Sequence, residues 1–265
     1  MLKIYARLWQ TNWAEQWQYR ANLLMYLLYW LVSPIVFLSV WRTVAASQGD
    51  VSGFTVNDFT TYYLTLLLVD NLTSQIVIHI LAYKIHDGTL SGELLRPIHP
   101  ILTHTLVNSL AFKALNFAAL LPIWAILYAL FRPDFSGVSP ANLLLVLPAI
   151  TLGFVINFLL GTVVTCIAFW TTRVYALAEF YGALTLLLGG VFVPLDLLPG
   201  LLQQAAQYLP FQLFLYFPIS LILGRLNVEQ IAWGFGMQAI WLSIAYALFH
   251  WVWHTGVRRF SAVGA

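Results

Sequence analysis

Charged residues and cysteine are scarce in this chain. Of its 265 residues, 12 are Lys or Arg and 10 are Asp or Glu, so charged types make up 8%, whereas a soluble domain carries about 25%. So few charges cannot cover the surface of a 30.0 kDa water-soluble globule, which excludes that class. Cys166 is the only cysteine, which excludes an intrachain disulfide and leaves the redox compartment undetermined.

Several motifs that carry chemistry are also absent. No Gly is followed by Lys, so the chain has no GxxxxGK[ST] loop and cannot hydrolyse ATP by that route. It has no HExxH or GxSxG sequence, and no metal or catalytic site is predicted. The net charge of +2 and the scattered basic residues exclude a nucleic-acid surface. Residues 1–20 lack the apolar core and cleavage site of a signal peptide.

Apolar and aromatic residues dominate instead. Hydrophobic types make up 61% of the chain and aromatic types 16%, with 11 Trp, and the mean hydropathy is +0.81. Tryptophan is enriched where a membrane protein meets the lipid headgroups. With about 20 residues needed for each crossing, we predict an all-α polytopic membrane protein with about six spans, forming a single transmembrane domain over residues 1–265.

The N-terminal residues 1–20 repeat an aromatic ring at every fourth position. Tyr5, Trp9, Trp13 and Trp17 share one slowly drifting helical face, beside basic residues. We interpret this segment as a helix lying in the membrane interface. The alternative is an ordinary solvated helix, in which three tryptophans would be exposed to water.

Six stretches are long and apolar enough to span a bilayer. We predict spans at 21–41, 59–82, 114–131, within 141–172, 176–192 and 231–253. The third is expected to continue backward as a helix to residue 101, because no breaker intervenes. Residues 42–58 are polar and contain Gly, and are expected to form a loop.

The apolar segment 193–224 is interrupted by Pro194, Pro199, Pro210 and Pro218. Proline at this spacing is poorly tolerated inside a helix, so we predict short broken or re-entrant helices packed near one membrane face. The alternative is a seventh full span over 197–224.

Basic residues predict the orientation. Six spans with both termini in the cytoplasm put eight basic residues inside and three outside, in accord with the positive-inside rule. The inner residues are Lys3, Arg7, Arg20, Lys84, Arg96, Arg173, Arg258 and Arg259; the outer ones are Arg42, Arg132 and Arg225.

One carboxylate falls in the middle of a predicted span. Asp70 is twelfth of the 24 residues of 59–82, and an ionised Asp at that depth costs about 2.5–3.5 kcal/mol. Asn71, Thr73, Ser74 and Gln75 follow it, so this patch should face a cavity, water or a partner helix. It is either a substrate or gating surface or a hydrogen-bonded contact in an oligomer. Glu179 and Tyr181, near the start of the fifth span, are candidates for the same path, with helix packing as the alternative.

The connection over residues 83–100 is the most charged in the chain and contains Gly and Pro. Its apolar residues Ile85, Leu90, Leu94 and Leu95 would form one side of a short amphipathic helix that offers this side to another protein. The alternative is a solvated loop.

Two stretches match sequence patterns of a known family of membrane proteins. The cytoplasmic signature of one branch, I-x-x-G-x-L followed by L-L-R-P-I, is matched by Ile85, Gly88, Leu90, Gly92, Glu93, Leu94, Leu95, Arg96, Pro97 and Ile98. The looser family pattern after the fifth helix is matched by Gly190, Phe192, Pro194, Leu198, Pro199, Leu209 and Pro210. In these residues the chain resembles the permeases of type-2 ABC exporters. With the N-terminal helix and six spans, the resemblance covers essentially the whole chain, although the first external loop is too small for an outer domain.

The resemblance implies a permease subunit in the bacterial inner membrane that pairs with a second permease, identical or similar. It implies two copies of a separate ATPase, which hold the ATP and Mg, and no cofactor in this chain. Residues 84–96 would act as the coupling helix, and 194–218 as external re-entrant helices with Pro194, Pro199 and Pro210 at the gate. The coupling residues are Lys84, Ile85, Asp87, Gly88, Leu90, Glu93, Leu94, Leu95 and Arg96.

An apolar, aromatic interior with Asp70 in it predicts an amphiphilic cargo, either cationic or lipid-like. Two other functions are open. An ion-coupled secondary transporter or channel would use Asp70 as its carrier group. A membrane enzyme acting on lipid would use His250 and His254, which stand four residues apart and lack a third metal ligand.

Overall fold

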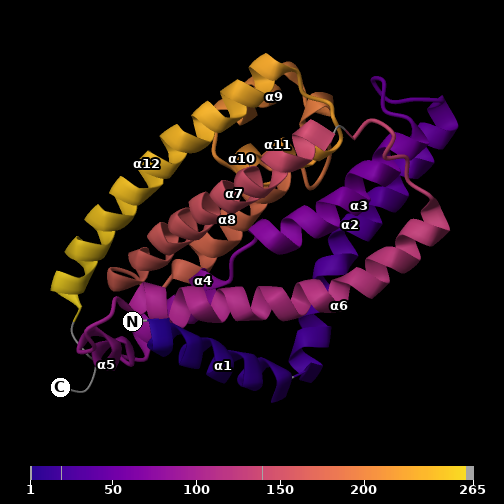
Figure 1. Cartoon of the computed structure of the whole chain (residues 1–265). Helices are drawn as coiled ribbons and strands as arrows, with labels where there is room; N and C mark the ends of the chain where they lie inside the picture. Colours follow the sequence, from indigo (N-terminus) through magenta and orange to yellow (C-terminus); the bar gives the residue numbers. More distant parts are fainter. Residues whose placement is uncertain (1, 19, 139, 261–265) are drawn as a thin grey trace.

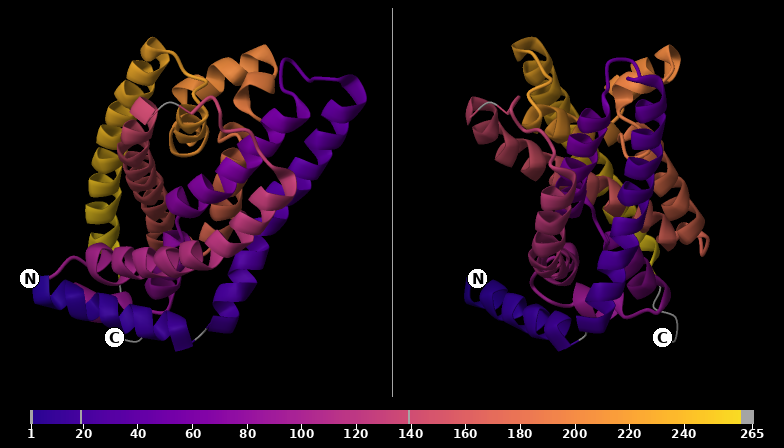
Figure 2. Two further views of the ribbon diagram at one scale, coloured as in Figure 1. Left: turned by 45° about the vertical axis from the view of Figure 1, so that its right-hand side comes forward. Right: turned by 90° about the vertical axis from the view of Figure 1, so that its right-hand side faces the viewer.

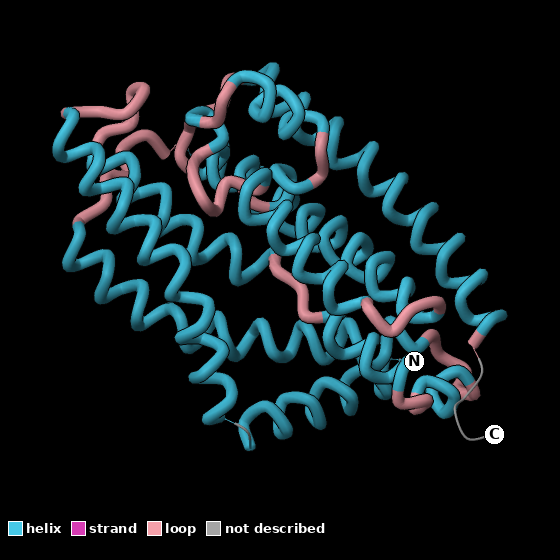
Figure 3. The backbone as a smooth tube through the Cα atoms, turned by 180° about the vertical axis from the view of Figure 1, so that it is seen from behind, coloured by secondary structure: helices cyan, strands magenta, loops and turns pink. Residues whose placement is uncertain are grey.

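The chain folds into a bundle of helices. The computed structural model describes residues 2–18, 20–138 and 140–260; residues 1, 19, 139 and 261–265 lie outside this description, as do the side chains of Lys3 and Arg20. Within these ranges no strand is formed, and the only β-pairing is an isolated bridge between Val51 and Phe54. The all-α prediction is confirmed. Most loops gather at the two ends of the bundle, and Figure 3 shows a further loop in its middle (Figures 1 and 3).

The first helix, α1 (Leu2–Gln18), lies across one end of the bundle beneath α6 (Figure 2). It is followed by α2 (Arg20–Gln48). The predicted loop from residue 42 is wrong in its first part, because RTVAASQ contains no helix breaker and the helix continues to Gln48. It ends at Gly49, whose φ of 87° is a left-handed conformation that glycine adopts without strain.

The predicted second span is not one helix. It consists of α3 (Val56–Thr73) and α4 (Val77–His86), separated by three non-helical residues. These residues are Ser74, Gln75 and Ile76, and the first two belong to the polar patch that begins at Asp70. The prediction of an unbroken span over 59–82 is therefore wrong, and the break lies beside its central carboxylate.

The third predicted span begins early, as expected. After α5 (Leu90–Leu94), a wider π-helical turn over Ile101–Leu106 leads without interruption into α6 (Val107–Phe131). The fourth span is α7 (Pro140–Cys166), extended by a short 3₁₀ turn over Ile167–Phe169.

The fifth predicted span, α8 (Val174–Leu188), ends four residues earlier than expected. Gly190 there has a φ of 88°, and its carbonyl accepts a 2.8 Å hydrogen bond from the buried Tyr62 hydroxyl of α3. Tyr63 and Trp41 both donate to the carbonyl of Phe192, at 2.8 and 2.9 Å. Contacts with α2 and α3 thus fix the turn that ends α8.

Residues 193–224 form short pieces, as their prolines predicted. They are a 3₁₀ turn over Leu195–Leu197 and the helices α9 (Gly200–Tyr208), α10 (Phe211–Phe214) and α11 (Tyr216–Ile222). Pro194, Pro199 and Pro210 each directly precede one of these pieces. A seventh full span over 197–224 is therefore wrong. The last helix, α12 (Val228–Arg259), packs mainly on α7.

In the part of the chain that the structure describes, four helical stretches are long and apolar enough to cross a membrane: Leu24–Gln48, Val107–Phe131, Asn142–Phe169 and Val228–Arg259. The fifth predicted span, α8, has 15 residues, a length of about 22 Å. Between these helices lies the largest buried cluster, to which Phe59, Tyr62, Tyr63 and Phe214 contribute.

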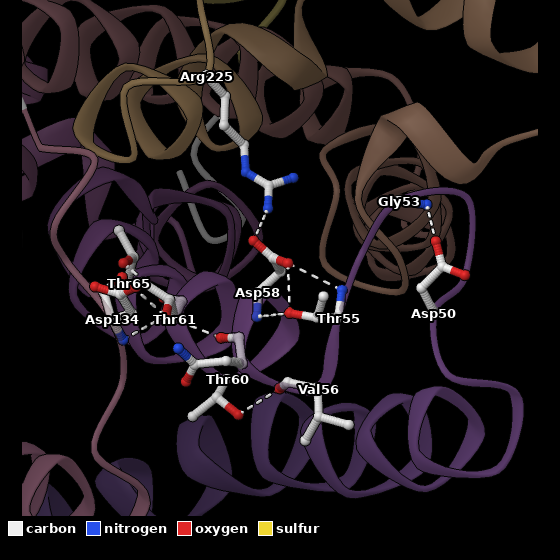
Figure 4. A network of polar contacts seen from close by, with 11 residues as sticks. Asp50, Gly53, Thr55, Val56, Asp58, Thr60, Thr61, Thr65, Asp134 and Arg225 are labelled. Atoms are coloured by element: carbon white, nitrogen blue, oxygen red, sulfur yellow. Dashed lines mark hydrogen bonds and ion pairs between the residues drawn. The ribbon is translucent and has the colours of Figure 1, made fainter.

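A polar clamp joins the start of α3 to two distant loops (Figure 4). Thr55 and Asp58 cap the helix reciprocally: the Thr55 side chain accepts from the Asp58 backbone, and the Thr55 backbone donates to the Asp58 carboxylate at 2.9 Å. The other carboxylate oxygen accepts from Arg225, which follows α11. The Thr61 hydroxyl accepts from the Asp134 backbone at 3.1 Å. The clamp fixes α3 against the loops that follow α6 and α11.

Gly234 allows α12 to approach α11 closely. A Cβ there would overlap the Phe217 ring, whereas a Cβ at Gly236 would have nothing within 4 Å. We therefore expect Gly234→Ala to destabilise the protein by about 1–3 kcal/mol through overpacking. Gly236→Ala should be neutral or slightly stabilising, since Ala favours helix over Gly by about 1 kcal/mol. Thermal unfolding of the two purified variants in detergent tests this pair, and equal melting temperatures would contradict it.

Candidate functional site

The break between α3 and α4 borders a cavity of about 480 Å³. Five helices line it: α2, α3, α4, α7 and α8. Rings and apolar side chains, including Tyr29, Trp30 and Pro34 of α2, form one wall. The polar side chains that line it include Asp70, Gln75, Asn157, Glu179, Tyr181 and Thr185. A mostly apolar cavity with a few convergent polar groups is the usual form of a small-molecule site.

The break exposes backbone groups that a continuous helix would pair internally. At Ser74 the backbone becomes extended, with φ −59° and ψ 163°, although its N–H still donates to the carbonyl of Asp70. The carbonyl of Thr73 accepts a 2.9 Å hydrogen bond from the Asn157 amide of α7. At the other side of the break, the Gln75 side chain accepts from the Val77 N–H at 2.9 Å. These partners replace the missing helical bonds.

Lys113 of α6 binds the end of α3. Its side chain is 8% exposed, and its ammonium donates to the carbonyl of Asn71 at 2.7 Å and to the Ser74 hydroxyl at 2.9 Å. A cation at this place is favoured because the last carbonyls of a helix carry partial negative charge. Asp70 lies near enough to attract the same ammonium. Lys113 thus hydrogen-bonds the broken helix end and attracts Asp70 electrostatically, without a direct ion pair between the two side chains.

The polar side chains of α7 and α8 extend this network. The Tyr181 hydroxyl donates to the Asn157 side chain at 2.7 Å, so a chain of hydrogen bonds runs from α8 through α7 to the carbonyl of Thr73. On α7, Gly161 leaves room for the Gln75 carboxamide, because a Cβ there would lie 2.6 Å from it. The break is therefore held by side chains from three neighbouring helices.

The structure brings together most of the residues predicted for the substrate path. Asp70, Gln75, Glu179 and Tyr181 line the same cavity. Asn71 does not; it lines a small space of about 10 Å³ on the other side of α3, shared with Lys113 and Asn116. The predicted polar patch is thus divided between two sides of the helix.

The predicted coupling segment leads directly out of α4. Gly88, with a φ of 77°, makes the turn into α5, and Lys84 and Glu93 close it with a 2.7 Å ion pair. Ile85 and Leu90 are buried in this chain's own core, so the predicted apolar side does not as a whole face outward. The reason is that these two side chains belong to one buried cluster with Val174 and Trp253, which come from later parts of the chain.

The outward face of this segment is smaller than predicted. Leu94 packs partly against the same core, but Leu95 is 88% exposed. Asp87 and Arg96 are exposed too, and a Cβ on Gly92 would meet nothing within 4 Å. The surface open to a partner centres on Leu95. The helices α9–α11 lie at the opposite end of the bundle (Figure 1), where Pro194 precedes the 3₁₀ turn, Pro199 precedes α9 and Pro210 precedes α10.

The histidines near the end of α12 form a ring cluster. The rings of His250 and His254 lie 4.1 Å apart, and that of His99 lies 4.8 Å from Trp253. Partial burial and, secondarily, His254 lower the pKa of His99. No group of three His, Cys, Asp or Glu side chains that could hold a metal occurs among the described residues.

We expect Lys113→Met to destabilise the protein by about 2–3 kcal/mol, because hydrogen bonds from a charged donor contribute about 1.5–3 kcal/mol. Adding Asp70→Asn should recover part of this loss, because it removes the carboxylate whose charge the ammonium would otherwise balance. Unfolding of the purified variants in mixed detergent measures these differences. A Lys113→Met protein as stable as the parent would contradict the assigned role.

Comparison with protein families matches residues 22–264 to the family described as ABC-2 family transporter protein. A search of curated proteins found no match. Membrane subunits of this family are non-catalytic, and a separate ATPase with which they pair hydrolyses ATP. The match covers nearly the whole chain and agrees with its apolar helices. The chain belongs to the ABC-2 transporter family, as a multi-pass transmembrane permease subunit.

Proposed function

We propose that this permease is the transmembrane subunit of an ATP-driven exporter that moves an amphiphilic, cationic molecule across the plasma membrane. One observation carries the proposal: the cavity beside the break is joined by a single helix to an exposed turn. Gln75, close before α4, lines the cavity together with Asp70 of α3, and Leu95 lies exposed after α5, the short helix that follows α4. The ten residues of α4 are about 15 Å long, so movement at one end reaches the other.

The chemistry of the cavity supports the cargo class. Two carboxylates, Asp70 and Glu179, line it, and no basic side chain does so among the described residues. Lys113 binds the far side of the break and balances part of the negative charge of Asp70. Glu179 is therefore the carboxylate of the cavity whose charge is less compensated. The rings of Tyr29, Trp30 and Tyr181 suit an apolar body and a cation beside it.

The proposed topology has six crossings with both termini in the cytoplasm. Four crossings are the long apolar helices; α3 with α4 would form the second, and α8 the fifth. A broken crossing is tolerated where its backbone is buried in protein or faces a cavity, and the partners of the break meet this condition. The helices α9–α11 would lie at the external end and close the pathway there.

The ATPase would bind the turn that contains α5. We propose two ATPase copies, which hold ATP and Mg, and a second permease chain, identical or similar. ATP binding would draw the two α5 turns together, and each α4 would turn about its break and change access to the cavity. Lys84 and Glu93 would keep the turn rigid, while Leu95, Asp87 and Arg96 would contact the ATPase.

An ion-coupled transporter is the second candidate, since such proteins bind cations at the ends of broken helices. Here the ammonium of Lys113 already donates a hydrogen bond to the carbonyl of Asn71. Fewer carbonyls at the helix end are therefore free to bind a transported ion. Transport driven by an ion gradient in vesicles that contain this chain alone would favour that function.

We expect Leu95→Asp to lower ATP-driven transport and co-purification of the ATPase at least tenfold, because a charge would be placed in an apolar contact. Leu201→Asp is the matched control: Leu201 is 83% exposed on α9, at the opposite end. It should leave both measurements unchanged. Unaltered ATPase recovery with Leu95→Asp would disprove the docking assignment.

We expect Asp70→Asn and Glu179→Gln each to raise the KM for export of tetraphenylphosphonium about tenfold, equivalent to about 1.4 kcal/mol. Each substitution removes a negative charge from the cavity. Asp134→Asn, in the exposed loop after α6, keeps its hydrogen-bond acceptor for Ser136 and should have no effect. Transport into inverted vesicles measures this. Unchanged KM values for both cavity variants would contradict the cationic cargo.

A further inference from the structure

A second cavity lies at the end of the bundle that holds α9. It has a volume of about 400 Å³ and is bounded by the 3₁₀ turn Leu195–Leu197, α9, α11 and the first turns of α12. It is separate from the cavity beside the break, with which it shares no lining residue. Its polar side chains include Asp196, Gln203, Gln207 and Glu229.

Charge in this second cavity has one sign. Asp196 and Glu229 are carboxylates, and no basic side chain lines the cavity among the described residues. The basic residue closest in sequence to this lining, Arg225, is engaged elsewhere: it pairs with Asp58 and lies 4.0 Å from the centre of the Phe54 ring. The remaining polar groups are carboxamides, which carry no net charge. The cavity therefore selects for positive charge.

Its aromatic wall is held in place by the surrounding structure. Trp233 is 52% exposed, and its ring lies edge-on to Tyr208 with a centroid distance of 6.0 Å. The Trp241 indole donates to the carbonyl of Tyr208 at 2.9 Å. Tyr216 lines the same cavity as Asp196. Tryptophan is the side chain that attracts an organic cation most strongly, and here it stands in the same cavity as two carboxylates.

The two cavities are neighbours across the junction of α10 and α11. Leu215, at this junction, lines the cavity beside the break, and the next residue, Tyr216, lines the second cavity. The backbone at Leu215 is non-helical, with φ −125° and ψ −73°, so the chain changes direction between them. Both cavities combine two carboxylates, carboxamides and aromatic rings.

We propose that the cavity lined by Asp196, Glu229 and Trp233 is a second binding site for hydrophobic organic cations, which receives the cargo after it leaves the cavity beside the break. The order in which the cargo visits the two sites rests on the proposed function. The existence of the second site does not. The cation would lie against Trp233, with the carboxylates balancing its charge.

Equilibrium binding of labelled tetraphenylphosphonium to the full chain in lipid nanodiscs tests this, with empty nanodiscs subtracted. We expect two saturable sites per chain. Gln207→Lys, which adds a positive charge to the second cavity, should abolish one site. Gln204→Lys is the matched control, because Gln204 is exposed on the same helix and does not line the cavity; it should keep both. Trp233→Ala should weaken one site about tenfold.

Tetraphenylborate, of the same shape and opposite charge, should compete poorly. The second site is disproved if Gln207→Lys and Trp233→Ala bind two equivalents with parental affinity, or if tetraphenylborate competes as well as unlabelled tetraphenylphosphonium. Glu179→Gln separates this proposal from the proposed function, since it should weaken binding only in the cavity beside the break. If it changes nothing while Gln207→Lys removes a site, the second site stands and the cargo assignment of the first cavity fails.

Discussion

Backbone groups inside a membrane must be paired, and the break after Asp70 meets this requirement through side chains from other helices. Lys113 binds the carbonyl of Asn71, and Asn157 binds that of Thr73. Without them the extended backbone at Ser74 would leave carbonyls unpaired in an apolar environment, at a cost of several kcal/mol each. The separation of α3 from α4 is thus possible only because α6 and α7 supply these partners.

The break gives the protein two features that a continuous helix would lack. It makes α4 a separate unit, with the cavity at one end and the exposed turn around Leu95 at the other. It also places Gln75 against Gly161, beside a cavity of about 480 Å³ that Asp70, Glu179 and Tyr181 line as well. The clamp at Asp58 and Arg225 holds α3 at its other end. We therefore infer that α3 is the fixed part and α4 the movable one.

The sequence predicted much of this architecture. The scarcity of charge and the length of the apolar runs indicated an all-α membrane protein, and four prolines indicated the short helices of residues 193–224. The break was missed because hydropathy averages over about 20 residues, while three polar or unfavourable positions suffice to interrupt a helix. Two signals could have revealed it: the run Asp70 to Gln75, rich in residues that hydrogen-bond their own backbone, and the opposite charge of Lys113 in a neighbouring span.

The predicted coupling segment shows a different limit of prediction from the sequence. Its apolar positions were identified, but periodicity cannot tell a side that faces a partner from one that faces the chain's own core. Ile85 and Leu90 are covered by residues from the cluster of Val174 and Trp253, which lie far away in the sequence. Likewise, Asn71 and Gln75 were expected on one surface, but the change of backbone direction at Ser74 puts them on different sides.

The distance between α4 and α8 within one chain tests the central claim most directly. Spin labels at Tyr83→Cys and Phe180→Cys, both exposed positions, can be placed on one permease chain of the assembled transporter, with Cys166→Ser as background. We predict that this distance changes when the ATPase binds ATP, because α4 turns about its break. An identical distance distribution with and without ATP would mean that the helices move as one rigid body, and would contradict the account.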